Sequence, residues 1–191
     1  MGCNHVIVTL AGDFLAPSVL SSLDNGKGMV DALNAVPVTH VCFGNHENDV
    51  PLKAQLRRMV QFKGTWLNTN MPDYPATPAM MQPNQILDVK SADGSHTRKV
   101  ALLGLMTAER VVHRAGAFGG AMETMVPVQE AAVKAAAEMA ARGDIDAVVP
   151  LTHQDMADDV ALSRAGLGFP VILGGPSKIA LSNQESARGH W

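Results

Sequence analysis

The sequence predicts a layered α/β domain with mixed sheets. Apolar runs rich in Val, Ile and Leu alternate along the chain with segments of helical character, a pattern typical of helices that cover the faces of a sheet. Alternating segments on either side of Asp93-Gly94 predict an antiparallel hairpin, which makes the sheets mixed. At 191 residues, 47% of them hydrophobic, the chain 1–191 is expected to form a single domain with a sizeable core.

The individual elements follow from local patterns. Ser18 is a candidate N-cap for a helix interrupted near Asn25-Gly26, Pro51 and Pro127 suit first helical turns, and Gly143 suits a C-terminal cap. Prolines between 71 and 84 predict a loop. We expect helices at 18–35, 50–61, 127–142 and 156–165. We expect strands at 5–11, 38–43, 65–70, 85–91, 97–105, 146–151 and 170–174.

Composition and charge argue against several classes of partner. The formal net charge is -3 and the pI about 6.1, so charge gives no reason to expect nucleic acid as a partner. No apolar run approaches the roughly 20 residues of a membrane span, and no secretory signal is visible, so we expect no membrane partner and a cytoplasmic location by default. Cys3 and Cys42 lack the spacing of a disulfide framework and are expected to be reduced, buried thiols.

Residues that could carry chemistry follow three of the expected strands. Gly12-Asp13 follows the first strand, Gly44-Asn45-His46-Glu47 the second, and His153 a later one. In parallel α/β sheets the carboxyl ends of the strands gather at one edge, where ligands bind. Asp13, Asn45, His46 and His153 would there place a carboxylate, an amide and two imidazoles around a divalent metal. Such mixed O/N ligands suit Mn²⁺, Zn²⁺ or Fe.

Each of these residues also has a structural interpretation. Taken alone, Asp13 would be a turn residue that caps a helix, His153 a hydrogen-bonded core residue, and Asp49 a helix cap. Consecutive residues that leave a strand point to opposite sides, so Asn45 and His46 are not expected to bind the same ion. One would bind the metal and the other would face the substrate.

The motifs resemble those of the calcineurin-like metallophosphoesterases, and within them the 5'-nucleotidase branch. The family pattern runs Asp-x-His, Gly-Asp, Gly-Asn-His-Glu/Asp, a lone His after a strand, and Gly-His-x-His. This chain carries the middle three in order, and Gly-Asn-His-Glu in their company is fairly specific. The resemblance covers roughly residues 6–178, with further matching segments at 13–18, 27–34, 67–70, 100–105 and 159–162.

The resemblance implies an α/β/β/α sandwich that hydrolyses a small-molecule phosphomonoester, in this branch a nucleotide, by a metal-activated water. It implies that Asp13 bridges two divalent metal ions and that Asn45 and His153 bind one of them. It also implies that His46 is the catalytic histidine, which protonates the leaving oxygen or stabilises the phosphoryl transition state, and that Asp49 orients the His46 imidazole.

Two parts of the family pattern are missing. No Asp-x-His segment precedes Gly12-Asp13, so the domain is expected to be N-terminally incomplete and to lack its first strand, and an unpaired sheet edge would favour self-association. The last motif is replaced by Gly175-Pro176-Ser177-Lys178, so at most one metal site is expected to be intact. Lys178 would bind phosphate or neutralise Asp13 in place of an ion, or it would be a solvated loop residue. We also expect the second, nucleotide-binding domain of that branch to be absent from residues 1–191.

Three functional hypotheses follow. The first is a metallophosphoesterase, and the second is a degenerate, catalytically weak relative that binds a phosphorylated ligand or a protein partner without turnover. The third, a nucleotide-binding module without metal, is disfavoured because neither Gly-x-Gly-x-x-Gly nor a phosphate-loop Lys-Ser/Thr is present. The histidines without a motif are expected to be structural or solvated: His5, His40, His96, His113 and His190.

Overall fold

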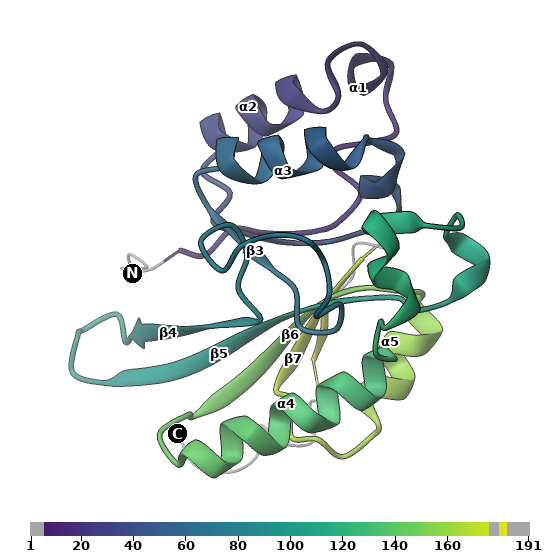
Figure 1. The fold of residues 1–191 in the computed structure, drawn as a ribbon. Coiled ribbons are helices and arrows are strands. Elements are labelled where there is room, and N and C mark those ends of the chain that lie inside the picture. Colours follow the sequence, from purple (N-terminus) through teal and green to yellow (C-terminus); the bar gives the residue numbers. More distant parts are fainter. Residues whose placement is uncertain (1–5, 176–179, 183–191) are drawn as a thin grey trace.

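Two sheets lie face to face in the computed structural model, which describes residues 6–175 and 180–182, and each sheet is covered by helices on its outer face (Figure 1). The helices α1 (Val19–Asp24), α2 (Lys27–Ala35) and α3 (Leu52–Gln61) cover one sheet. The helices α4 (Val128–Arg142) and α5 (Met156–Ser163) cover the other. This α/β/β/α layering confirms the predicted fold class.

The first sheet is parallel and has the strand order β1-β2-β3. Its strands are β1 (Thr9–Ala11), β2 (His40–Cys42) and β3 (Thr65–Leu67), each shorter than the sequence predicted. Ala11 lies opposite Cys42, so the loops that follow β1 and β2 leave the sheet side by side. Within the described residues β1 pairs with β2 alone, and the expected self-association at an open edge stays a prediction.

The second sheet is mixed and has the order β4-β5-β6-β7-β8. The predicted hairpin is confirmed as antiparallel β4 (Asn84–Lys90) and β5 (Thr97–Met106), while β5, β6 (Ala147–His153) and β7 (Val171–Gly175) are parallel. A last strand, β8 (Ala180–Ser182), pairs antiparallel with β7 and was not predicted. Three residues are too few to reveal a strand by periodicity.

The helix ends follow the expected capping residues, with one division. Ser18 accepts a hydrogen bond from the Ser21 backbone in a capping box, and Gly143 ends α4 at φ 72°. The predicted interruption of helix 18–35 is confirmed: the segment divides into α1 and α2 at Asn25 and Gly26, which both adopt positive φ. Three 3-10 helices were not predicted: η1 (Asn45–Asp49), η2 (Arg110–Val112) and η3 (Ala117–Glu123).

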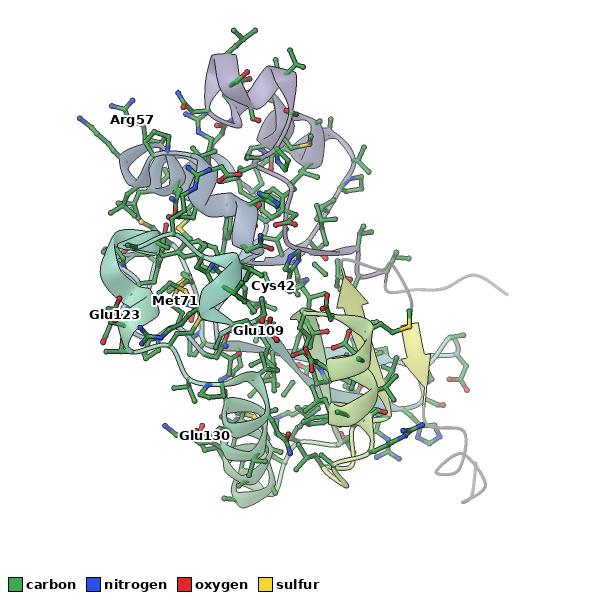
Figure 2. All side chains as sticks on the ribbon, turned by 90° about the vertical axis from the view of Figure 1, so that its right-hand side faces the viewer. Cys42, Arg57, Met71, Glu109, Glu123 and Glu130 are labelled. Atoms are coloured by element: carbon green, nitrogen blue, oxygen red, sulfur yellow. The ribbon has the colours of Figure 1, made fainter. Side chains whose placement is uncertain are left out.

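The core has three parts that match the layers. The part beneath α2 and α3 contains most of the chain's few aromatic residues, with Phe43 in ring contact with Trp66, Tyr74 and Phe118. The part between the sheets contains Cys42, and Figure 2 shows Cys42 and Met71 inside the molecule and Arg57 at its surface. Burial raises the pKa of the Cys42 thiol well above its usual value, as expected for an inert structural cysteine; Cys3 lies outside the described residues. In the described ranges, no helix combines the length and apolarity that crossing a bilayer requires.

Candidate metal centre

Three polar side chains from distant parts of the sequence meet at the carboxyl ends of β1, β2 and β6. The Nε2 atom of His153 lies 3.1 Å from Asn45 Oδ1 and 3.3 Å from Asp13 Oδ2. Asp13 follows β1, Asn45 begins η1 after β2, and His153 is the last residue of β6. The structure therefore brings together the three residues that the sequence predicted as metal ligands, although their role as ligands stays a prediction.

The ring of His153 is fixed in an orientation that suits a ligand. Its Nδ1 atom donates a hydrogen bond of 2.7 Å to the Ala11 carbonyl, which can only accept. In the neutral imidazole this bond places the lone pair on Nε2, the atom that faces Asp13 and Asn45. Metal-binding histidines are commonly held in this way by an acceptor on the other ring nitrogen.

Two glycines leave the room that this convergence needs. A Cβ atom on Gly44 would lie 2.3 Å from Asp13 Oδ1 and 2.8 Å from His153 Cε1. A Cβ atom on Gly12, which has φ +71°, would lie 2.4 Å from the backbone nitrogen of Gly44. Any side chain at either position would therefore push the strand ends apart.

A buried carboxylate, Glu47, holds the two loops against each other. Its Oε1 atom accepts backbone hydrogen bonds from Phe14 (2.7 Å) and Leu15 (3.0 Å), and its Oε2 atom accepts from Asp13 (2.8 Å) and Gly44. Burial raises the pKa of Glu47, whereas these backbone N–H groups act against the rise.

The anchoring role of Glu47 was not predicted from the sequence. The spacing that could have found it is an acid three residues after a turn glycine, as in a capping box.

Asp13 and His153 interact electrostatically, and each shifts the pKa of the other. Burial acts to raise the pKa of Asp13, but the hydrogen bond and charge of His153 outweigh it, and the pKa falls below the usual value. For His153, burial acts to lower the pKa, and the bonds to Asp13 and to the Ala11 carbonyl reverse that, so the pKa is raised. The electrostatics of the site therefore favour the ionised form of the Asp13 carboxylate and a positive charge beside it.

His46 lies on the same turn but faces a different group. Its Nδ1 atom is 2.7 Å from Asp49 Oδ2, and its backbone N–H donates to Asp13 Oδ1 at 2.9 Å. Asn45 and His46 do not alternate as predicted for residues that leave a strand, because both belong to the 3-10 helix η1. In that helix residues three apart lie above one another, which is why His46 and Asp49 meet. The His46 side chain is 43% exposed, and Arg114 lies 3.6 Å from Asp49.

The remaining predicted residues have other environments or fall outside the described ranges. His40 is buried and bonded to Thr39 and Gln85, His96 is exposed in the hairpin, and half-buried His113 donates to the Thr107 carbonyl. These contacts agree with structural or solvated roles. His5, His190, Pro176, Ser177 and Lys178 lie outside the described residues.

The donor set is small but chemically coherent. Within residues 6–175 and 180–182, no group of three or more His, Cys, Asp or Glu side chains is placed to hold a metal. The convergent set contains one His, one Asp and one Asn. One imidazole, one carboxylate and one amide oxygen fit a single divalent ion that keeps open coordination positions.

Comparisons with known proteins agree on the fold. No family model matches the chain, and no curated protein matches it. Among solved structures, the NAD nucleotidase of Haemophilus influenzae is 22% identical with a TM-score of 0.74, covering 94% of this chain and 34% of its own. The 5'-nucleotidase precursor of Thermus thermophilus is 21% identical with a TM-score of 0.73, covering 90% of this chain and 32% of its own.

A third neighbour is a calcineurin-like phosphoesterase, YfkN of Bacillus subtilis, which is 18% identical with a TM-score of 0.68. The match covers 95% of this chain and 61% of that protein. The chain thus spans about a third of the length of the first two neighbours. At these identities the similarity shows the fold: the chain has the fold of the calcineurin-like phosphoesterases and 5'-nucleotidases that its motifs resemble.

Proposed function

We propose that the chain is a metal-dependent hydrolase of small phosphomonoesters, with nucleotides as the substrate class. The observation that supports this proposal is the meeting of Asp13, Asn45 and His153 around one point, beside a histidine that is free to reach a substrate. The fold of the nucleotidase and phosphoesterase structures agrees with it.

Asp13, Asn45 and His153 would hold one divalent ion, with Mn²⁺, Zn²⁺ or Fe as the candidates. The hydrogen bond from His153 Nδ1 to Ala11 would leave the Nε2 lone pair available to such an ion. Three protein ligands leave positions for water and for a phosphate oxygen. When bound, such an ion supplies positive charge and Lewis acidity to the phosphate.

His46 and Asp49 would handle the proton. Asp49 holds the His46 imidazole through Nδ1, so Nε2 is the atom left to face the substrate. His46 would donate a proton from there to the leaving oxygen, or stabilise the negative charge of the phosphoryl group. Such groups typically contribute about 10²–10⁴-fold to a rate.

Metal content is the first test. After dialysis against Mn²⁺ or Zn²⁺, mass spectrometry should find about one ion per chain, and Asp13→Ala and His153→Ala should each lose it. His96→Ala, in the exposed hairpin, is the control and should bind as the wild type does. If the Asp13 and His153 variants retain as much metal as the wild type, the assignment of these residues as ligands is wrong.

Turnover is the second test. Hydrolysis of AMP or p-nitrophenyl phosphate with Mn²⁺ should fall about 10²–10⁴-fold in His46→Asn while its metal content stays unchanged. An unchanged rate would assign the activity to another site. Metal and AMP binding without hydrolysis would instead support the degenerate, weakly catalytic alternative, which the Pro176-Ser177-Lys178 sequence favours.

A further inference from the structure

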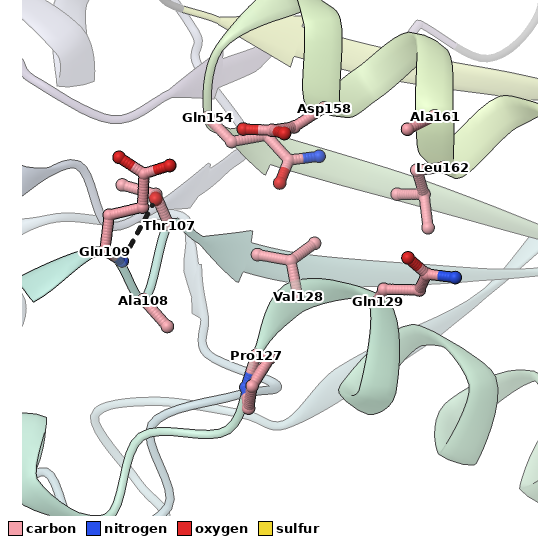
Figure 3. A pocket seen from close by; sticks show the side chains of 10 residues that line it. All are labelled: Thr107, Ala108, Glu109, Pro127, Val128, Gln129, Gln154, Asp158, Ala161 and Leu162. Atoms are coloured by element: carbon pink, nitrogen blue, oxygen red, sulfur yellow. Dashed lines mark hydrogen bonds between the residues drawn. The ribbon is translucent and has the colours of Figure 1, made fainter.

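A cavity of about 340 Å³ opens beside the candidate metal centre, between the first turn of α4 and the helix α5 (Figure 3). Its volume lies at the small end of the range for ligand pockets. It has ten lining residues: Thr107, Ala108, Glu109, Pro127, Val128, Gln129, Gln154, Asp158, Ala161 and Leu162.

The cavity continues into the metal centre. A smaller depression of about 70 Å³ is lined by Asn45 and His153 themselves. The two cavities share one wall, made of Thr107, Glu109, Gln154 and Asp158. A molecule held by its phosphate over His153 could therefore extend its remaining part into the larger cavity.

The shared wall is held by hydrogen bonds to the ends of β6, which carries His153, and of its neighbour β7. The backbone N–H of Thr107 donates to the His153 carbonyl at 2.8 Å, and that of Gln154 donates to Gly175 at 2.9 Å. The Gln154 side chain is buried and donates to Asp159 at 2.8 Å. The cavity wall is thus positioned by the same β-sheet that carries His153, so the wall and the His153 ring have a fixed spacing.

The lining combines apolar and polar side chains. Pro127, Val128, Ala161 and Leu162 offer apolar surface, while Glu109 and Asp158 belong to the shared wall (Figure 3). The ten lining residues include these two carboxylates and no Lys, Arg or His. Carboxylates accept hydrogen bonds from hydroxyl and amino groups and repel a second phosphate.

We propose that this cavity holds the leaving group of the substrate, and that it selects an uncharged or cationic group with an apolar face and hydroxyl or amino donors. A nucleoside offers this chemistry, so a nucleoside monophosphate fits better than a substrate with additional phosphates. This inference rests on the proposed function for the position of the phosphate, but the cavity can be tested without metal or turnover.

The first experiment measures binding of adenosine alone by isothermal titration. Ala161 is exposed on α5 and lines the cavity, so Ala161→Trp should fill it and weaken adenosine binding at least about tenfold. Ala157→Trp, also exposed on α5 but outside the cavity, is the matched control and should bind adenosine as the wild type does. Thermal melts verify that both variants fold. No binding to the wild type, or equal binding by Ala161→Trp, would overturn the proposal.

The second experiment tests selection by charge. The ratio of AMP affinity to ADP affinity should fall at least about fivefold in the double variant Glu109→Gln, Asp158→Asn, because removing the carboxylates removes the repulsion of the second phosphate. Glu130→Gln lies in the first turn of α4 outside the lining and should leave the ratio unchanged. An unchanged ratio in the double variant would remove the charge argument.

The measurements of metal content, hydrolysis and adenosine binding together separate this proposal from the proposed function. If adenosine binds as expected but neither metal binding nor hydrolysis is found, the cavity proposal is supported and the hydrolase proposal fails. If hydrolysis depends on His46 but adenosine does not bind, the cavity proposal fails alone.

Discussion

The two halves of the molecule contribute to the candidate site by different physical means. The half built on β1, β2 and β3 supplies Asp13, Asn45 and His46 from the segments that follow β1 and β2, and the buried Glu47 carboxylate ties these segments together. The half built on β5, β6 and β7 supplies His153 from the end of a strand that pairs on both sides. A loop position needs an added anchor, whereas a central strand is fixed by its neighbours.

The two histidines reflect this difference. The side chain of His153 is 3% exposed and is held by a backbone carbonyl, which suits a ligand whose position must not change. The side chain of His46 is 43% exposed and is held by a side-chain carboxylate, which suits a group that must reach a substrate. Burial thus distinguishes the residue proposed to bind metal from the residue proposed to transfer a proton.

The largest expected effect comes from removing the anchor of the first half. In Glu47→Gln the amide nitrogen would face two buried backbone N–H donors that lose their acceptor, and each such loss costs about 1–3 kcal/mol. We therefore expect urea unfolding to show a loss of at least about 2 kcal/mol. Glu130→Gln, an exposed acid on α4, should stay within about 0.5 kcal/mol. A small loss in Glu47→Gln would mean that the loops hold each other without the carboxylate.

Where the two halves meet, we expect an intermediate effect, and it concerns metal binding. Gly44 has φ -112°, a conformation that alanine adopts readily, so Gly44→Ala disturbs contacts and not the backbone preference. Its Cβ would displace Asp13 from His153, and we expect metal retention about 10–100-fold weaker, as for other changes that reorient ligands. Metal titration of the folded variant measures this, and wild-type affinity would show that the halves tolerate a wider spacing.

In the second half we expect the smallest effect, a small change in the free energy of unfolding. Asp159 is buried and accepts from Thr152 (2.7 Å) and Gln154 (2.8 Å), both on Oδ1, so the amide of Asp159→Asn can keep both bonds. We expect a change within about 1 kcal/mol at pH 7. A loss as large as that of Glu47→Gln would show that the second half also depends on a buried charge.

The same variant has an expected pH dependence. Burial raises the pKa of Asp159 above its ordinary value of 3.8, although its two hydrogen bonds act against the rise. The folded protein therefore holds this proton more tightly than the unfolded chain, and the resulting stability is lost as pH rises through the folded pKa. Asp159→Asn lacks this titration. Its stability relative to wild type should increase from pH 4 to pH 7, and unfolding at several pH values measures the difference.

Sequence patterns predicted the order of the main elements and the residues of the site. Asp13, Asn45 and His153 were found because polar residues that follow parallel strands share an edge, and Asp49 was found by its place in a motif. The patterns missed η1, so the reason given for the different directions of Asn45 and His46 was wrong. They also missed η2 and η3, because the segment between β5 and α4 has no regular apolar period.

By itself the sequence determined the alternation of strands and helices, because hydrophobic periodicity and capping residues act over a few neighbours. It also determined which residue types could meet at the strand ends. Only the tertiary structure decided that Glu47 binds four backbone N–H groups, that Ala11 orients His153, and that a cavity lies beside the site. These features join residues as much as 142 positions apart, and no local pattern encodes which distant groups will share one buried space.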